Sequence, residues 1–430
     1  MSSAAPRPSG IGLVGSGSLT FVGVAGAAAT VYALQVAMGR MLPVADYSLY
    51  AALAGIFNMV AVPLSAVLLV VTRAVALEAG RKDAGGATAV RHQAVRELTI
   101  GGTAVVLVGI ATSGFLATSL GSPSPWPVAA MWVAVGVNVS LALGLALLQG
   151  AHRFAHLTAA NLASAGARLI ACIALVALGL GVVGAMAGIA LACAIGAVAV
   201  WWALGPASAS ERPLRPTHGL LLSRGALVLA VSNLAFIAMS QFDYVLVRVF
   251  LDPEQASQYA AGAVLAKSVL WLPVGIVIAL FPMVASEAAA SRPIRHLLRQ
   301  GLLMAAVTSG ALAAVLALGA GFWIRLLYGP RFDAAAPYLA WLSLAYLPMA
   351  IVLVVDNHQL ALHRARFILA YAGVALAEVL ALALPGATLD RLVAVIVAGS
   401  LLCLAWALWI VAGQLRAGTD EEAGSRLSRS

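Results

Sequence analysis

The chain has 430 residues, of which 62% are hydrophobic and only 10% are charged, and its mean hydropathy is +1.00. Soluble domains carry about 25% charged residues, so this composition excludes a soluble globular protein and indicates a polytopic membrane protein. The net charge of +9 comes from 25 Lys and Arg against 16 Asp and Glu. In a membrane protein, basic cytoplasmic loops explain such an excess better than nucleic-acid binding does.

A membrane-spanning helix takes roughly 20 apolar residues, and twelve segments of the chain meet that requirement. The sequence therefore predicts an all-α integral membrane fold with about twelve transmembrane helices. In chain order, the predicted spans are Ser16–Gly39, Leu49–Thr72, Ala94–Leu120, Trp126–Gln149, Leu157–Leu180, Val182–Leu204, Leu221–Phe250, Gln258–Val284, Leu297–Ala320, Ala336–Val355, Phe367–Leu384 and Leu392–Val411.

Loop charges orient these spans. If the N-terminus is cytoplasmic, 18 of the 25 basic residues lie in cytoplasmic segments and five lie in segments on the outer side of the membrane. This bias predicts that both termini are cytoplasmic. We expect the polar end of the tail, from Asp420, to lack regular structure. The predicted organisation is a cytoplasmic N-terminus (1–15), an N-lobe of helices one to six (16–204), a cytoplasmic inter-lobe linker (205–220), a C-lobe of helices seven to twelve (221–413) and a polar cytoplasmic tail (414–430).

The two halves of the chain repeat each other at offsets of 208 to 211 residues. Six spans separate the copies, so both halves have the same topology, as in transporters built from parallel repeats. Two six-helix lobes of this kind can enclose a central cavity with a polar lining. The matched positions are Arg40 with Arg248, Tyr50 with Tyr259, Pro63 with Pro273, Glu78 with Glu287, His152 with His363 and Arg168 with Glu378.

Three stretches resemble a known family. FDYVLVRVFLDPEQASQYAAGAVLAK and LPVGIVIALFPMVASEAA resemble the seventh and eighth spans of polysaccharide flippases, and LLYGPRFDAAAPYLAWLSLAYLP is similar to the elbow before their tenth span. These flippases belong to the multidrug/oligosaccharidyl-lipid/polysaccharide (MOP) export superfamily, in the branch of O-antigen and exopolysaccharide flippases. The similarity extends over most of the chain and is strongest from Arg224 to Arg366.

The resemblance implies two lobes around a cavity that opens alternately to each side of the bacterial cytoplasmic (inner) membrane. It implies a transporter rather than an enzyme. The cargo would be a polyprenyl-pyrophosphate-linked oligosaccharide used to build a cell-surface polysaccharide such as lipopolysaccharide. The expected partners are this lipid-linked glycan and the bilayer, with no nucleic acid. Glycan-assembly enzymes are a further candidate partner, which would meet the basic loop between spans two and three. No cofactor is expected beyond a coupling H⁺ or Na⁺.

Four basic side chains are candidate substrate-binding residues, because a cationic group can bind pyrophosphate. Arg168 lies about eleven residues into its span, roughly 16 Å along the helix and near the midplane, where an arginine costs about 2.5 to 3.5 kcal/mol without a polar environment. It must face a cavity or pair with a carboxylate. Arg40 and Arg248 either line the cavity or extend to the water interface. Lys267 either binds phosphate or pairs with Asp243.

Three carboxylates in the predicted C-lobe, Asp243, Asp356 and Glu378, are candidate cation-coupling residues. An ionisable group inside a membrane is costly and often marks an ion pathway. Two structural alternatives stay open: Asp243 pairs with Lys267, and Asp356 is exposed at the interface. Three other functions also remain: a cation-coupled multidrug or small-molecule exporter of the same superfamily, a membrane scaffold that transports nothing, and a six-plus-six facilitator of another superfamily.

Overall fold

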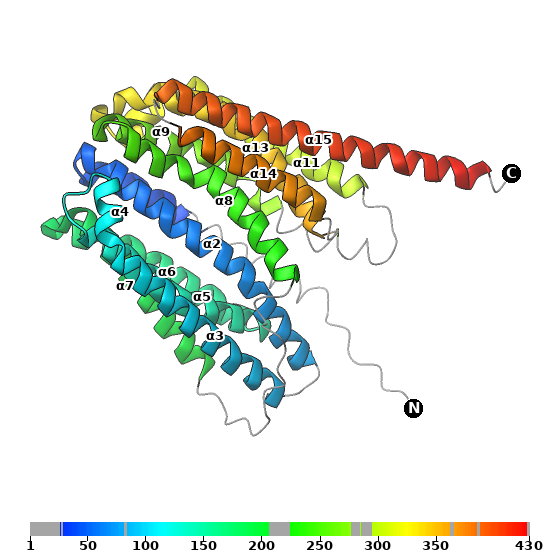
Figure 1. The fold of residues 1–430 in the computed structure, drawn as a ribbon, viewed down its shortest axis with the longest axis horizontal. Coiled ribbons are helices and arrows are strands. Elements are labelled where there is room, and N and C mark those ends of the chain that lie inside the picture. The colour runs from blue at the N-terminus through cyan, green and yellow to red at the C-terminus, as the bar shows by residue number, and fades with distance from the viewer. Residues whose placement is uncertain are drawn as a thin grey trace. The chain divides into compact units, whose positions relative to one another are not determined.

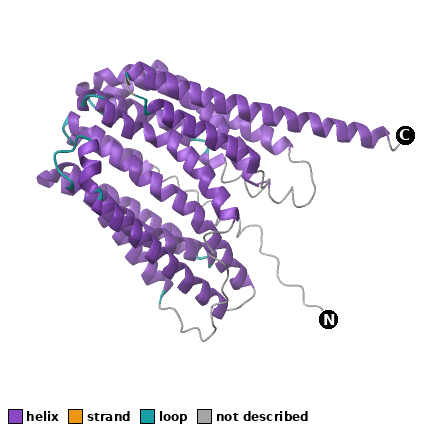
Figure 2. Ribbon diagram, in the orientation of Figure 1, coloured by secondary structure: helices purple, strands orange, loops and turns teal. Residues whose placement is uncertain are grey.

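The computed structural model describes residues 26, 29–80, 84–205, 224–276, 284, 295–361, 365–384 and 388–427. Within these ranges the chain forms helices joined by short turns, and no strand occurs (Figures 1 and 2). The predicted N-terminal segment 1–15, nearly all of the linker 205–220 and the last three residues of the tail lie outside the described residues.

Nine helices in the described part of the chain are long and apolar enough to cross a membrane, and the helix over 370–382 is shorter but also apolar. One of the nine stretches, Phe154–Leu204, contains two successive helices that meet at Gly179, where φ is 86°. The described helices match eleven of the predicted spans, and the first predicted span is helical over 29–41. The bounds are α2 Val44–Gly80, α3 Ala84–Ala111, α4 Ser113–Ser119, α5 Trp126–Gly150, α6 Phe154–Leu175, α7 Gly181–Leu204, α8 Arg224–Phe250, α9 Pro253–Trp271, α11 Arg295–Leu318, α12 Ala320–Leu327, α13 Ala336–Ala361, α14 Ala365–Leu382 and α15 Leu389–Leu427, with a π-helical turn at Val176–Leu180 and a 3-10 turn at Pro330–Ala335.

One expectation about an individual element is wrong. The tail was expected to be irregular from Asp420, but α15 continues to Leu427. Ala, Glu, Arg and Leu in this stretch are good helix formers, and they extend a helix that has already begun. The two prolines matched by the repeat lie in different structures. Pro63 is inside α2, whereas Pro273 lies in a turn just after α9 ends.

The chain folds into two compact units. The first contains residues up to Leu42 and Val60–Leu227; the second contains Pro43–Met59 and Val228–Ser430. The first half of α2 therefore packs with the C-terminal helices, which the sequence repeat does not indicate.

In the first unit, α7 packs closely against α5 and α6. Small residues allow this approach: a Cβ added to Gly188 would lie 2.6 Å from the backbone nitrogen of Cys172. At the end of α7, Arg153 donates to the Ala203 carbonyl at 2.6 Å and Arg91 donates to the Gly205 carbonyl at 3.0 Å. Two arginines of the predicted cytoplasmic loops therefore satisfy carbonyl groups at a helix C-terminus, where positive charge is favourable.

In the second unit, α13 packs against α9, α11 and α15 (Figure 1). The start of α2 joins this unit through Ser48, whose backbone N–H donates to Ser257 Oγ at 2.9 Å. The Tyr47 and Tyr328 hydroxyls lie 3.0 Å apart, and both rings pack on Phe332. These contacts fix the beginning of α2 against α9 and the 3-10 turn, next to the helices that carry most of the candidate site.

Candidate functional site

An ion pair lies in the interior of the second unit. Lys267 Nζ of α9 donates to Asp243 Oδ1 at 2.8 Å and to Oδ2 at 2.9 Å, and both side chains are almost fully buried. The pairing that the sequence left open between these residues is therefore present. Because each charge neutralises the other, the pair can exist among apolar helices where either charge alone could not.

Three tyrosines surround the pair. Tyr259 donates its hydroxyl proton to Asp243 Oδ2 at 2.9 Å, and Tyr346 of α13 donates to the same oxygen at 3.3 Å. The ring of Tyr244 lies under the ammonium group, with Lys267 Nζ 3.2 Å from the ring centroid. The carboxylate is thus held by neighbours on α9 and α13, and the ammonium has an aromatic face as its third contact.

The other two predicted carboxylates are buried as well. Ser232 Oγ donates to Asp356 Oδ2 at 2.8 Å, while Asp356 Oδ1 has no hydrogen-bond partner among the described residues. The alternative that Asp356 is exposed at the interface is wrong, because its exposure is 4%. Asp356 lies inside α13, which runs on to Ala361, so it is not at the helix end that the sequence suggested.

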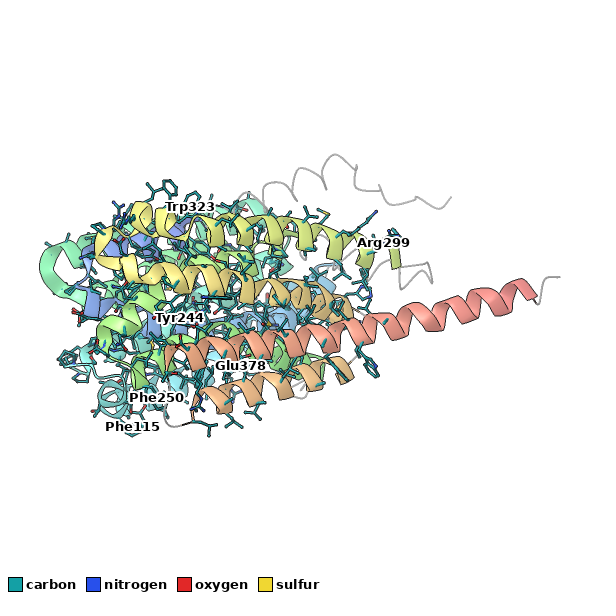
Figure 3. All side chains as sticks on the ribbon, turned by 90° about the horizontal axis from the view of Figure 1, so that it is seen from above. Phe115, Tyr244, Phe250, Arg299, Trp323 and Glu378 are labelled. Atoms are coloured by element: carbon teal, nitrogen blue, oxygen red, sulfur yellow. The ribbon has the colours of Figure 1, made fainter. Side chains whose placement is uncertain are left out.

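Glu378 of α14 is 5% exposed, and its Oε2 lacks a hydrogen-bond partner within the part of the chain described (Figure 3). The carboxyl group lies directly against Gly399 of α15, where a Cβ would come within 2.8 Å of Glu378 Cδ. Glu378 interacts electrostatically with Asp243, and Tyr371 interacts with both Glu378 and Asp356. Hydrogen bonds join Asp243 to Lys267, Tyr259 and Tyr346, whereas Glu378 and Asp356 are linked to this group by electrostatic interactions alone. These buried side chains of the second unit are together called the polar network.

The three predicted arginines have different surroundings. Arg248 is buried and donates to the Ala45 carbonyl and to Ser48 Oγ, both at 3.1 Å, so it is engaged with the start of α2 and does not extend to water. Arg40 is exposed at the end of the helix over 29–41. Arg168 is half-buried within α6 and interacts with the thiols of Cys172 and Cys193. The assignment of these arginines and of Lys267 to cargo stays a prediction.

Several residues of the network were missed by sequence reasoning. Tyr244, Tyr259, Tyr346 and Tyr371 read as ordinary apolar positions, and only the in-span charges next to some of them signalled a polar interior. Tyr244 is adjacent to Asp243 in sequence, but Tyr346 reaches the same carboxylate from 103 residues away. Gly399 gives no signal in the sequence at all.

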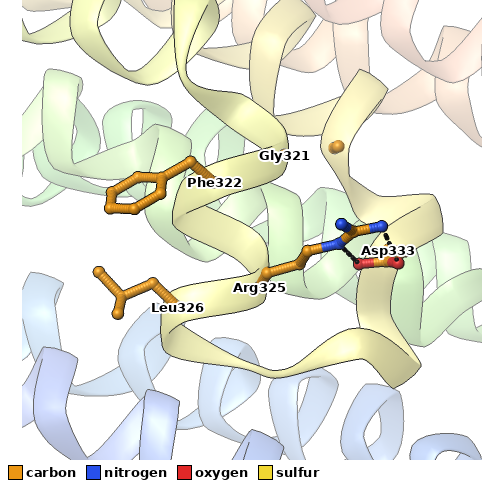
Figure 4. Close-up of a pocket in the computed structure, with 6 residues that line it drawn as sticks. Gly321, Phe322, Arg325, Leu326 and Asp333 are labelled. Atoms are coloured by element: carbon orange, nitrogen blue, oxygen red, sulfur yellow. Dashed lines mark hydrogen bonds and ion pairs between the residues drawn. The ribbon is translucent and has the colours of Figure 1, made fainter.

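The structure offers no obvious metal centre, since no three His, Cys, Asp or Glu side chains gather together among the described residues. An open pocket elsewhere in the second unit lies between α12 and the 3-10 turn. There Arg325 makes two 2.8 Å hydrogen bonds to the Asp333 carboxylate, and these bonds raise the pKa of the guanidinium (Figure 4). Both side chains are largely exposed, so this pair contributes little to stability.

Comparison with solved structures identifies the fold. The structure is similar to the inward-facing conformation of a multidrug resistance MATE family transporter of the MOP superfamily, with a TM-score of 0.76, 14% identity and coverage of 90% of this chain and 95% of that one. The outward-facing conformation of a multidrug resistance MATE family transporter matches with a TM-score of 0.66, 14% identity and coverage of 94% and 95%. The eukaryotic MATE transporter AtDTX14 matches with a TM-score of 0.67, 15% identity and coverage of 92% and 94%.

The chain thus has the fold seen in these MATE family transporters, a fold that the resemblance implied. A family model described as "Polysaccharide biosynthesis protein" matches residues 88–337, more than half of the chain. The chain belongs to this polysaccharide biosynthesis protein family. No curated protein sequence matches it.

Proposed function

We propose that this protein is a flippase that moves a polyprenyl-pyrophosphate-linked oligosaccharide across the bacterial cytoplasmic membrane by alternating access. The glycan would serve the synthesis of a cell-surface polysaccharide. Membership of the polysaccharide biosynthesis protein family supports this cargo, and the transporter fold supports the alternating movement. No covalent chemistry is needed, because the lipid tail can stay in the bilayer while the head group crosses.

The observation that carries the proposal is the environment of Arg168. Arg168 is the one Lys, Arg, Asp or Glu residue in α6, and it is half-buried rather than enclosed. Asn138 lies close by, since Cys193 Sγ donates to Asn138 Oδ1 at 3.8 Å and Cys193 also interacts with Arg168. A half-buried guanidinium at membrane depth needs polar neighbours or a polar cavity, and its planar fork of N–H groups fits a pyrophosphate.

The test uses purified protein in liposomes with a fluorescent polyprenyl-pyrophosphate oligosaccharide. A membrane-impermeant quencher reports the fraction of the lipid in the outer leaflet over time. We expect protein-dependent movement that Arg168→Ala abolishes while the amount of folded protein is unchanged. Arg325→Ala is a matched control, because it removes an exposed arginine at the open pocket and should transport normally.

Partial activity of Arg168→Lys would show that charge alone contributes and that the guanidinium geometry contributes the rest. Full activity of Arg168→Ala would refute the assignment of this residue. Absence of any lipid movement by the wild-type protein, with Arg168 variants no different, would refute the flippase itself.

A cation-coupled exporter of the same superfamily is the second candidate. Two observations favour it: the fold matches MATE family transporters, and Asp356 and Glu378 each keep a buried oxygen without a hydrogen-bond partner among the described residues. Such oxygens can take a proton or a metal cation. Uptake of a cationic dye driven by a proton or sodium gradient, without movement of the lipid-linked glycan, would favour this function.

A further inference from the structure

Both oxygens of the Asp243 carboxylate are hydrogen-bonded, Oδ1 to one donor and Oδ2 to three. A carboxylate offers about four acceptor positions. Lys267 Nζ contacts both oxygens, and Tyr259 and Tyr346 donate to Oδ2. All four residues are buried, so water cannot exchange for any of these donors without movement of the helices. Asp243 therefore differs from Asp356 and Glu378, whose oxygens are not all engaged.

The Lys267 ammonium is held just as closely. Two of its contacts are the Asp243 oxygens, and its remaining side rests on the Tyr244 ring. A cation at this point, bound by carboxylate oxygens, close to phenol groups and lying over an aromatic face, has the surroundings expected of a bound monovalent cation. Here the cation is the ammonium group of a lysine side chain, so it is covalently attached to the protein.

We propose that Lys267 is a tethered cation that fills the position at Asp243 which a Na⁺ or a proton from solution would otherwise take. Asp243 then binds no solution cation in the wild-type protein. Removal of the ammonium group opens a latent site for a monovalent cation, formed by the Asp243 oxygens with the hydroxyl groups of Tyr259 and Tyr346.

The titratable groups around the Asp243–Lys267 pair come from four helices. They are Tyr244 on its own helix α8, Lys267 and Tyr259 on α9, Tyr346 on α13 and Glu378 on α14. Lys267 is the one basic group in this set, and Glu378 adds a second carboxyl. When Lys267 is replaced by an uncharged residue, the site keeps one or two acidic groups and loses its cationic side chain. This favours binding of a cation from solution.

The inference bears on energy coupling in the proposed transporter, but its first test measures binding and does not depend on transport. Thermal unfolding of the detergent-purified full-length protein is followed while NaCl replaces choline chloride at constant ionic strength, at pH 6 and pH 8. The variants are Lys267→Met, which keeps the side-chain volume, and the double variant Lys267→Met/Asp243→Asn, which also removes the acid.

We expect wild-type protein and the double variant to show no specific response to Na⁺ or pH at this site. Lys267→Met should gain a saturable rise in Tm, either with Na⁺ or on acidification. At about ten times its Kd, a bound cation raises the Tm of a protein of this size by about 2 °C. A response to NaCl identifies sodium, and a response to acid alone identifies a proton.

Two results would overturn the inference. One is a Na⁺ or acid response in wild-type protein that the double variant loses, because Asp243 would then bind a solution cation beside Lys267. The other is a Lys267→Met variant that responds to neither cation. If Lys267→Met is too unstable to purify, Lys267→Ala expressed and purified with propylammonium chloride gives a second test. The propylammonium ion should raise the Tm of this variant in a saturable way that choline does not reproduce. Equal effects of the two salts on Tm would contradict a cation site.

Discussion

The contact between Glu378 and Gly399 can be tested by adding one methyl group. In the native structure α15 presents the bare backbone of Gly399 to the Glu378 carboxyl group of α14. A Cβ at this position would overlap Glu378 Oε2 and would lie 2.8 Å from Cδ. Gly399→Ala must therefore move a buried carboxyl group or push the two helices apart.

The magnitude follows from two opposed effects. Overpacking a filled interior typically costs 1 to 3 kcal/mol, whereas replacing glycine by alanine inside a helix contributes about 0.5 to 1 kcal/mol of stability. The expected net effect of Gly399→Ala is a loss of stability of up to about 2.5 kcal/mol. For a chain of this length, that corresponds to a fall in Tm of up to about 3 °C.

Thermal unfolding monitored by intrinsic fluorescence measures this change. Gly373→Ala is the matched control, since Gly373 lies in α14 and a Cβ there would meet nothing within 4 Å. Its Tm should stay constant or rise. In a Glu378→Ala background the clash is gone, so Gly399→Ala should become neutral or stabilising. The reasoning is refuted if Gly399→Ala lowers Tm equally in both backgrounds or behaves like Gly373→Ala.

Four further tests address other side chains. Asp243→Asn leaves the Lys267 ammonium buried without its counter-charge and should cost about 3 to 5 kcal/mol of stability. The resulting drop in Tm should be reversed by Lys267→Met in the double variant. An equal Tm for the single and the double variant would contradict the pairing. Tyr47→Phe and Tyr328→Phe each remove the 3.0 Å hydroxyl contact and should each cost about 0.5 to 1.5 kcal/mol, with no added loss in the double variant; additive losses would argue against a shared bond. Glu378→Gln should remove gradient dependence from transport if this carboxyl group couples a cation, and an unchanged response to the gradient would exclude that role. Arg325→Ala should leave Tm unchanged because its ion pair is exposed, and a measurable loss would show that the open pocket contributes to stability.

The sequence by itself determined the parts of this protein that depend on apolar length and on repetition. A span must be long and apolar wherever it lies in the fold, so α5 at Trp126–Gly150 and α7 at Gly181–Leu204 could be located within a residue or two. The repeat around Arg40 and Arg248 predicted two lobes, because duplicated segments fold alike. The charges of Asp243, Lys267, Asp356 and Glu378 marked the C-lobe as polar inside for the same energetic reason that makes such residues rare in membranes.

Tertiary structure alone decided what those charges do. Tyr346 reaches Asp243 from another helix, and Gly399 makes room for Glu378 from a third, and neither approach follows from any local pattern. The first half of α2 joins the second unit because Tyr47 and Ser48 find their partners there, although the repeat assigns the whole helix to the first half of the chain. A charge in a span requires a partner, but which helix supplies that partner is set by packing between segments far apart in sequence.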